Sequence, residues 1–393
     1  MKNLNRLFKF YFILSPFLFV KPFLIGTLPK KIDRPVFFYI SIMLISLVHL
    51  ILSPFNNENQ WLIFVNIIIW LFLFLAALSI KRYANYIKYK DVVFIFYSSI
   101  FVTLCIFFYW VTYYKTLNIF SQNSLIGDFL GGYSGHSRVQ MIAFSFFSVI
   151  FLSRKEWGKF FIANIFMLIT TFMSGLFLYY IILITVLIFI NSPQKSMKYL
   201  VLVSGVILIF SFVLENNFSY LFKQLYAIFS LNPPRKIVSF IQTYEYFKSD
   251  FVHTLFGAGP GHFSSRLAFI VGGEYISGFP SSLVYRSSEF FNNHFQLWNA
   301  YTLSIPFNDG TANQPFSVYN QIVGEYGIIG TFCFIYFYIL GFTKFIRTNK
   351  YKLFLILLLL SYFILEYWFE YFSIVFLFEV LMRNETIYIR EKA

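Results

Sequence analysis

The chain has 393 residues, of which 58% are apolar, 23% aromatic and only 12% charged. A soluble domain usually carries about 25% charged residues, and this many Phe, Leu and Ile side chains leave too few polar residues to cover a water-soluble fold. The composition excludes a soluble protein and predicts an all-α polytopic integral membrane protein. The net charge of +14 lies in short segments between apolar runs, as in cytoplasmic loops, which argues against nucleic acid as a partner.

Apolar runs long enough for a membrane-spanning helix, about 20 residues, follow one another along the chain. They predict spans at 36–53, 61–80, 92–113, 198–214, 319–342 and 352–367. A shorter run, 138–152, begins at Arg138 and predicts another span. In the first forty residues, basic groups on both sides of an apolar run fit either a short hairpin or a tilted interfacial helix.

Two longer apolar stretches predict helical hairpins, because both flanks of the first are basic and each exceeds one span. The first, 160–191, is expected to turn near Ser174–Gly175. The second, 352–382, is expected to turn near Glu366–Glu370. In total the sequence predicts about 10–12 transmembrane helices.

The basic segments also predict one large external loop. Placing 81–91, 153–159, 192–197 and 343–351 inside leaves 215–318 outside, with six basic and six acidic residues. A loop of this length within a compact protein is usually functional. The expected organisation is therefore an N-terminal transmembrane bundle (1–214), a large periplasmic loop (215–318), and C-terminal transmembrane helices with a cytoplasmic tail (319–393).

The external loop contains a turn rich in glycine, Gly257-Ala-Gly-Pro-Gly261, which an amphipathic helix joins to Arg235. Glycines allow a close backbone approach to a ligand, and exposed N–H groups in such a turn bind anions; an ordinary turn is the simpler alternative. The turn is neither a P-loop nor a dinucleotide-binding fingerprint. Cys105 and Cys333 lie in apolar runs, and HExxH, CxxC and Asp-x-Asp motifs are absent, so neither a metal nor another cofactor is expected.

The candidate site residues are arginines, histidines and one glutamate. Arg138 opens a span, and Arg235, Arg266 and Arg286 lie in the large loop, where the forked donors of Arg suit a pyrophosphate. External histidines such as His262 and His294 suit acid–base chemistry near neutral pH. Glu325 falls one to two turns into an apolar helix, where a carboxylate is costly unless it faces a polar cavity or a partner.

The order of these features resembles the O-antigen polymerase and ligase superfamily, the Wzy-type polymerases and their ligase relatives. The resemblance covers roughly residues 120–380. It consists of the external segment ending in Gly135-His136-Ser137-Arg138, a Thr-Thr-x-x-Ser-Gly break at 170–175, the helix from Arg235 to the Gly257–Gly261 turn, and Glu325-Tyr-Gly-Ile-Ile-Gly330. Two places depart from the pattern. Phe316 and Ser317 stand where the ligases resemble one another in a His-Asn pair, which favours polymerase over ligase, and Gly175 replaces an Arg.

The resemblance implies a GT-C-like architecture in the bacterial inner membrane with the active site facing the periplasm. It implies a metal-independent glycosyltransferase that joins repeat units of a surface polysaccharide, O-antigen or capsule, with undecaprenyl-pyrophosphate-linked glycans as donor and acceptor. Arg138, Arg235, Arg266 and Arg286 would bind the pyrophosphate, and Glu325, with His262 or His294, would activate or position the acceptor. A chain-length regulator and a flippase are further partners to consider.

Three other functions stay open at this point. A ligase-type glycosyltransferase of the same superfamily lacks its expected histidine at position 316. A transporter or flippase for lipid-linked sugar would show internal repeats and charges in broken helices, and no repeat between the halves is evident. A purely structural membrane protein would not need the long loop with its Arg and Gly turns.

Overall fold

The computed structural model describes residues 32–56, 59–114, 137–169, 173–190, 226–227, 229–230, 233–248, 250–273, 280–299, 301–302, 315–366, 369 and 372–388. All regular structure in these segments is helical. The predicted span 198–214 and the first 31 residues lie outside them. The prediction of an all-α protein is therefore confirmed for the described residues.

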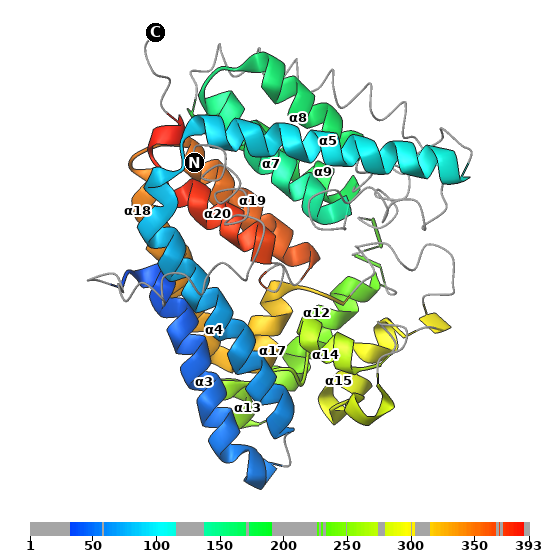
Figure 1. The fold of residues 1–393 in the computed structure, drawn as a ribbon. Coiled ribbons are helices and arrows are strands. Elements are labelled where there is room, and N and C mark those ends of the chain that lie inside the picture. Colours follow the sequence, from blue (N-terminus) through cyan, green and yellow to red (C-terminus); the bar gives the residue numbers. More distant parts are fainter. Residues whose placement is uncertain are drawn as a thin grey trace.

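The first three described helices match the predicted spans. They are α3 (Arg34–Asn56), α4 (Gln60–Tyr83) and α5 (Tyr89–Tyr114). Helices α3 and α4 lie side by side, while α5 crosses the other end of the molecule (Figure 1). Asn59 caps α4, since its side chain accepts hydrogen bonds from the backbone N–H groups of Trp61 and Leu62.

Of the next three helices, the first lies in the interior of the bundle. Helix α7 (Ser137–Ser153) is buried from Val139 to Leu152, and α8 (Trp157–Ile169) packs against it. Helix α9 (Met173–Ile190) follows after residue 172. The prediction that 160–191 divides into two helices near Ser174–Gly175 is confirmed, since α8 ends at Ile169 and α9 begins at Met173. Ser174 and Gly175 themselves lie in the first turn of α9, where serine is also favourable.

The last helices come from two predicted apolar stretches. Helix α17 (Val318–Cys333) continues through the π-helical segment η5 (Phe334–Ile339) into α18 (Leu340–Ile346). The second stretch forms α19 (Tyr351–Leu365) and α20 (Phe372–Arg383), followed by the short η7 (Thr386–Tyr388). The prediction that 352–382 divides near Glu366 is confirmed.

Helix α17 is not the straight span that 319–342 predicts. Gly327 has φ 63° and ψ −158°, which interrupts the helix after Tyr326. The end of α13 and the residue after it pack into this break, since a Cβ on Gly327 would lie 2.5 Å from the backbone carbon of Leu255 and 2.7 Å from the backbone nitrogen of Gly257. Only glycine adopts this backbone conformation readily, so the sequence Tyr-Gly-Ile marks a kink in this helix.

Short helices fill the described part of the predicted loop. They are α12 (Arg235–Lys248), α13 (Phe251–Phe256), α14 (Arg266–Val271), η3 (Ser281–Leu283), α15 (Ser288–Asn292) and η4 (Phe295–Leu297). The amphipathic helix predicted to start at Arg235 is confirmed. Helices α12 and α13 pack on α17, whereas α14, α15 and η4 enclose a small apolar cluster that includes Phe269, Phe290 and Phe316.

Among the residues that the structure describes, four helical segments are long and apolar enough to cross a membrane. They are Arg34–Leu52, Gln60–Tyr86, Tyr89–Tyr109 and Val318–Ile346, and α7, α8, α9 and α19 supply shorter apolar helices. Large apolar side chains on these segments are exposed, such as Ile51, Phe101 and Phe332. An apolar exterior of this kind suits a bilayer, because lipid replaces water around it.

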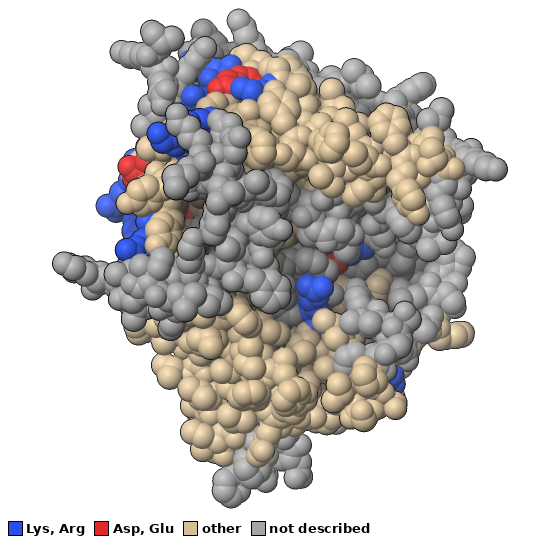
Figure 2. Space-filling model, viewed as in Figure 1, with Lys and Arg blue, Asp and Glu red and all other residues tan. Residues whose placement is uncertain are grey.

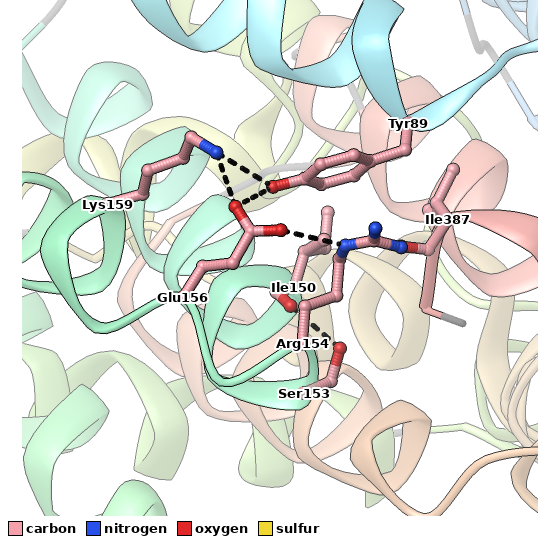
Figure 3. Close-up of polar contacts among 7 residues, drawn as sticks. All are labelled: Tyr89, Ile150, Ser153, Arg154, Glu156, Lys159 and Ile387. Atoms are coloured by element: carbon pink, nitrogen blue, oxygen red, sulfur yellow. Dashed lines mark hydrogen bonds and ion pairs between the residues drawn. The ribbon is translucent and has the colours of Figure 1, made fainter. Parts of the chain in front are cut away.

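Two of the predicted inside segments, 81–91 and 153–159, meet at one end of the bundle. The Arg154 guanidinium lies 3.6 Å from the centre of the Tyr89 ring and donates to the Ile387 carbonyl (3.2 Å), while Glu156 accepts from both Arg154 and Lys159 (Figure 3). Figure 2 shows many basic side chains together along the upper left edge of one face. Segments that the sequence assigns to one side of a membrane therefore contact one another.

Candidate functional site

The first turn of α12 contains a buried lysine. Two prolines precede Arg235, and proline suits the start of a helix because no backbone N–H is needed there. Lys236 is 5% exposed, and its ammonium donates to three backbone carbonyls, those of Phe316, Leu365 (2.9 Å) and Ile364 (3.3 Å). The two carbonyls at the end of α19 carry the negative end of the helix dipole, which stabilises a cation. Burial lowers the pKa of Lys236 to about 7.

An ion pair joins α7 to the end of α19 beside this lysine. Arg138, the second residue of α7, donates to the carboxylate of Glu366, which follows the last residue of α19. The side chains are 14% and 3% exposed. Both act electrostatically on Lys236, Glu366 favouring and Arg138 disfavouring its charged form. We call Arg138, Lys236 and Glu366 the charge junction; they come from three elements and span more than two hundred positions of the sequence.

The start of α17 is fixed to the same place. Ser317 caps α17, accepting from the Tyr319 N–H, and its hydroxyl donates to the Phe363 carbonyl (2.9 Å). The Val318 N–H donates to the Glu366 carbonyl (3.2 Å). Phe316 is fully buried in the small apolar cluster. Phe316 and Ser317 therefore have packing and capping roles here.

His294 lies against the same helix as Lys236. Its Nε2 is 3.2 Å from the Thr243 hydroxyl and 3.3 Å from the Ser239 carbonyl, and the side chain is fully buried. Its Nδ1 has no hydrogen-bond partner among the described residues. Burial lowers the pKa of His294 to about 3, with the charge of Lys236 adding to the effect. The imidazole is therefore neutral at physiological pH.

This low pKa predicts a measurable pH dependence. Unfolded histidine takes up a proton below about pH 6.5, whereas the folded side chain does not until about pH 3. Stability should therefore fall as the pH drops through this range, by about 3 kcal/mol between pH 6.5 and pH 4. Thermal unfolding of detergent-solubilised protein should show this loss in the wild type and a smaller one in His294→Asn. Equal losses in the two proteins would contradict a neutral buried His294.

Glu325 is bound by the turn that follows the glycines. Its Oε1 accepts hydrogen bonds from three successive backbone N–H groups, those of Phe263 (3.1 Å), Ser264 (3.0 Å) and Ser265 (2.9 Å). Such a nest of N–H groups binds anions. These N–H groups lie after the predicted turn Gly257–Gly261 and not within it, and a carboxylate of the chain itself occupies them. Within the turn, the N–H groups of Ala258 and Gly259 donate to backbone carbonyls of α17.

This arrangement predicts different effects for two substitutions of Glu325. Glu325→Ala leaves three buried N–H groups without this acceptor and should cost at least about 3 kcal/mol. Glu325→Gln keeps an acceptor oxygen and should cost about 1 kcal/mol. Thermal unfolding of the purified variants checks the order. Equal losses would show that the hydrogen bonds to Oε1 contribute little to folding.

His262 connects the glycine turn to the start of α4. Its Nε2 accepts from the Asn59 N–H (3.0 Å), and Nδ1 donates to the Pro260 carbonyl (2.9 Å). Both ring nitrogens are thus engaged, and the side chain is 2% exposed. These contacts give His262 a defined role in holding the turn against α4.

The remaining predicted arginines occupy different places. Arg235 is half-buried beside Lys236 and donates to the Leu297 carbonyl (2.7 Å). Arg286 donates to the Gly272 carbonyl (2.8 Å) and covers the Phe295 ring at 4.2 Å. Arg266 begins α14 and is half-buried. Of the predicted arginines, Arg138 and Arg235 thus lie near Lys236. Arg286 contacts the small helices of the loop.

Sequence reasoning missed two members of the charge junction. The prediction selected Arg235 and not its neighbour Lys236, although a lysine in the first turn of an amphipathic helix can be recognised from the sequence. In the prediction, Glu366 marked only the division between two helices. Its ion pair with Arg138 joins residues 228 positions apart, and a single sequence contains no sign of such a contact. Within the described segments, no three His, Cys, Asp or Glu side chains lie close enough together to hold a metal ion.

Comparison of the chain with protein family models, with curated proteins and with solved structures found no match.

Proposed function

We propose that this protein is a polymerase that joins lipid-linked oligosaccharide repeat units into a surface polysaccharide. The observation that carries the proposal is the charge junction, where Arg138 and Lys236 converge at helix ends of an apolar protein. Cations buried beside a membrane require anionic partners. Glu366 is that partner of Arg138 in the absence of substrate, and the forked donors of Arg also suit a diphosphate. The resemblance in the order of sequence motifs points to the same substrate.

The chemistry needs few groups. An acceptor hydroxyl attacks the anomeric carbon of the donor glycan, the bond from this carbon to the diphosphate breaks, and the hydroxyl proton passes to a base. Arg138, with Arg235 and Lys236 nearby, would stabilise the charge that develops on the departing diphosphate. Arg266 and Arg286 would bind more distant parts of the substrate, in the small helices.

His294 is the base that we propose. Of the two predicted histidines, it keeps a ring nitrogen without a partner among the described residues, whereas both nitrogens of His262 are engaged. A diphosphate bound near Lys236 would raise the pKa of His294 again, because a nearby negative charge favours the imidazolium. Glu325 would support the acceptor side of the site by holding the turn after Gly261.

The finer architecture belongs to the same proposal. We propose 10–12 transmembrane helices in a GT-C-like arrangement, with the described basic end in the cytoplasm and the small helices α12 to α15 in the periplasm of an inner membrane. The donor and acceptor would be glycans on undecaprenyl pyrophosphate, and no metal would take part. Phe316 and Ser317, which cannot supply a ligase histidine, favour the polymerase over the ligase.

Deletion and complementation test the function. A strain lacking the gene should make only single-repeat glycan, and the wild-type gene should restore the ladder on a gel. Arg235→Ala should abolish the ladder while the protein still accumulates. Lys248→Ala is the matched control, because Lys248 ends the same helix with an exposed side chain, and it should restore the ladder.

Three other outcomes would contradict the polymerase proposal. Long lipid-linked chains that are not attached to their final carrier would make the protein a ligase. Repeat units that accumulate on the cytoplasmic face would make it a flippase. An unchanged ladder after deletion would remove the polymerase proposal.

A further inference from the structure

We infer that Glu366 is a positioning residue that pairs with Arg138 when no substrate is bound. The substrate displaces the Glu366 carboxylate, which pairs with Arg138 again when the product leaves. This inference rests on the proposed function, since the anion that displaces Glu366 is the diphosphate of the lipid-linked donor. The resting structure holds the Arg138 guanidinium on the Glu366 carboxylate, and both are largely buried. Without substrate, the guanidinium that we propose for binding the diphosphate is thus paired with a carboxylate of the chain itself.

The first argument is the cost of burying a charge. Removing one partner from a buried ion pair leaves the other charge uncompensated, at a cost of several kcal/mol. An empty site containing Arg138 therefore needs an anion of its own. Glu366 supplies it, from an extended residue directly after the end of α19 (φ −156°, ψ 171°).

The second argument is that the displaced carboxylate has another cation nearby. Glu366 already favours the charged form of Lys236 electrostatically, and Lys236 donates to the carbonyls of Ile364 and Leu365, the two residues before Glu366. When a diphosphate binds Arg138, the displaced carboxylate pairs with the Lys236 ammonium, which gives up one of its three carbonyl acceptors in exchange. The exchange therefore leaves neither Glu366 nor Arg138 as an unpaired buried charge.

The third argument concerns release. A site with two cations and no competing anion would retain the lipid diphosphate after the glycan has moved to its acceptor. A carboxylate that competes for Arg138 weakens the binding of donor and product alike, because only the fraction of protein with Arg138 available binds the anion. Glu366 thus lowers affinity and speeds turnover.

The test measures binding of inorganic pyrophosphate, and then of undecaprenyl pyrophosphate, to the purified full chain in detergent by titration calorimetry. Glu366→Gln should bind pyrophosphate about tenfold more tightly than the wild type, as expected if about a tenth of the wild-type protein has Arg138 available. Arg138→Ala should lose most of the binding. Glu245→Gln is the matched control, because it removes one negative charge from the exposed surface of α12, and its affinity should equal that of the wild type.

Steady-state polymerisation provides the second measurement. Glu366→Gln should lower both KM for the donor and kcat, with a burst in the first turnover from slow product release. A large loss of kcat without tighter pyrophosphate binding would make Glu366 a base and overturn the inference, and so would unchanged or weaker binding by a folded variant. If Glu366→Gln does not accumulate, Glu366→Asp keeps the charge and shortens the side chain, and it should bind pyrophosphate more tightly than the wild type.

The two proposals can fail separately. If Arg138→Ala and Arg235→Ala abolish the glycan ladder while Glu366→Gln and Glu366→Asp leave pyrophosphate affinity unchanged, the polymerase proposal stands and the role of Glu366 falls. If Glu366→Gln tightens pyrophosphate binding but deletion of the gene leaves the ladder intact, Glu366 competes with an anion in a protein of another function.

Discussion

On the proposed function, Arg138→Ala is expected to reduce polymerisation at least a hundredfold, and to destabilise the protein by about 1–3 kcal/mol. The stability loss arises because the Glu366 carboxylate, 3% exposed, would exchange its arginine for Lys236, whose ammonium already donates to three backbone carbonyls. The activity loss arises because a departing diphosphate would lose a forked donor. Thermal unfolding and glycan synthesis in membranes with equal amounts of protein measure the two effects.

A double variant separates the two effects. Arg138→Ala with Glu366→Ala removes both charges, so it should regain most of the stability that Arg138→Ala loses. It should remain inactive, because the diphosphate still lacks its arginine. A double variant that regains both stability and activity would show that Arg138 serves folding alone.

Gly257→Ala is expected to prevent the protein from accumulating in the membrane. Gly257 has φ +81°, and a Cβ there would lie 2.3 Å from the backbone carbon of Glu325 and 2.5 Å from the backbone nitrogen of Tyr326. Neither atom belongs to a flexible side chain, so the turn or the helix must move. The strain of the left-handed backbone alone costs about 1–3 kcal/mol, and the overlap adds more.

Gly158→Ala is the matched control for this prediction. Gly158 lies in α8, and a Cβ there would meet nothing within 4 Å. Alanine in a helix is favoured over glycine by about 0.5–1 kcal/mol, so this variant should accumulate at least as well as the wild type. Immunoblots of membrane fractions and unfolding in detergent compare the two. Normal accumulation of Gly257→Ala would show that the turn does not need its contact with α17.

Helix positions could be read from the sequence because spans depend on local composition. The runs 36–53, 61–80 and 92–113 lie within α3, α4 and α5. They could be predicted because polar or turn-forming residues bound each run. The kink at Gly327 could not be read, because it depends on the turn at Leu255–Gly257 packing against it, about seventy residues away in sequence.

The candidate site could be predicted only in part, because the sequence shows local features and not the contacts between distant elements. Arg138 and Arg235 were found because an arginine at the edge of an apolar run stands out locally. Their arrangement was not, because Glu366 and Lys236 join them through contacts between elements far apart in the sequence. Glu325 was correctly recognised as a carboxylate that needs a partner, but the three N–H groups that bind it could be identified only from the fold.

The contacts at the basic end of the bundle have a consequence for biogenesis. The Asn384 side-chain amide donates to the carbonyls of Ala84 (2.6 Å) and Ile87 (2.7 Å), groups synthesised 300 and 297 residues earlier. The turn between α4 and α5 therefore leaves the ribosome long before its hydrogen-bond partner exists. Until Asn384 has been synthesised, water must satisfy those two carbonyls, so this end of the bundle reaches its final packing only after α20 has been made.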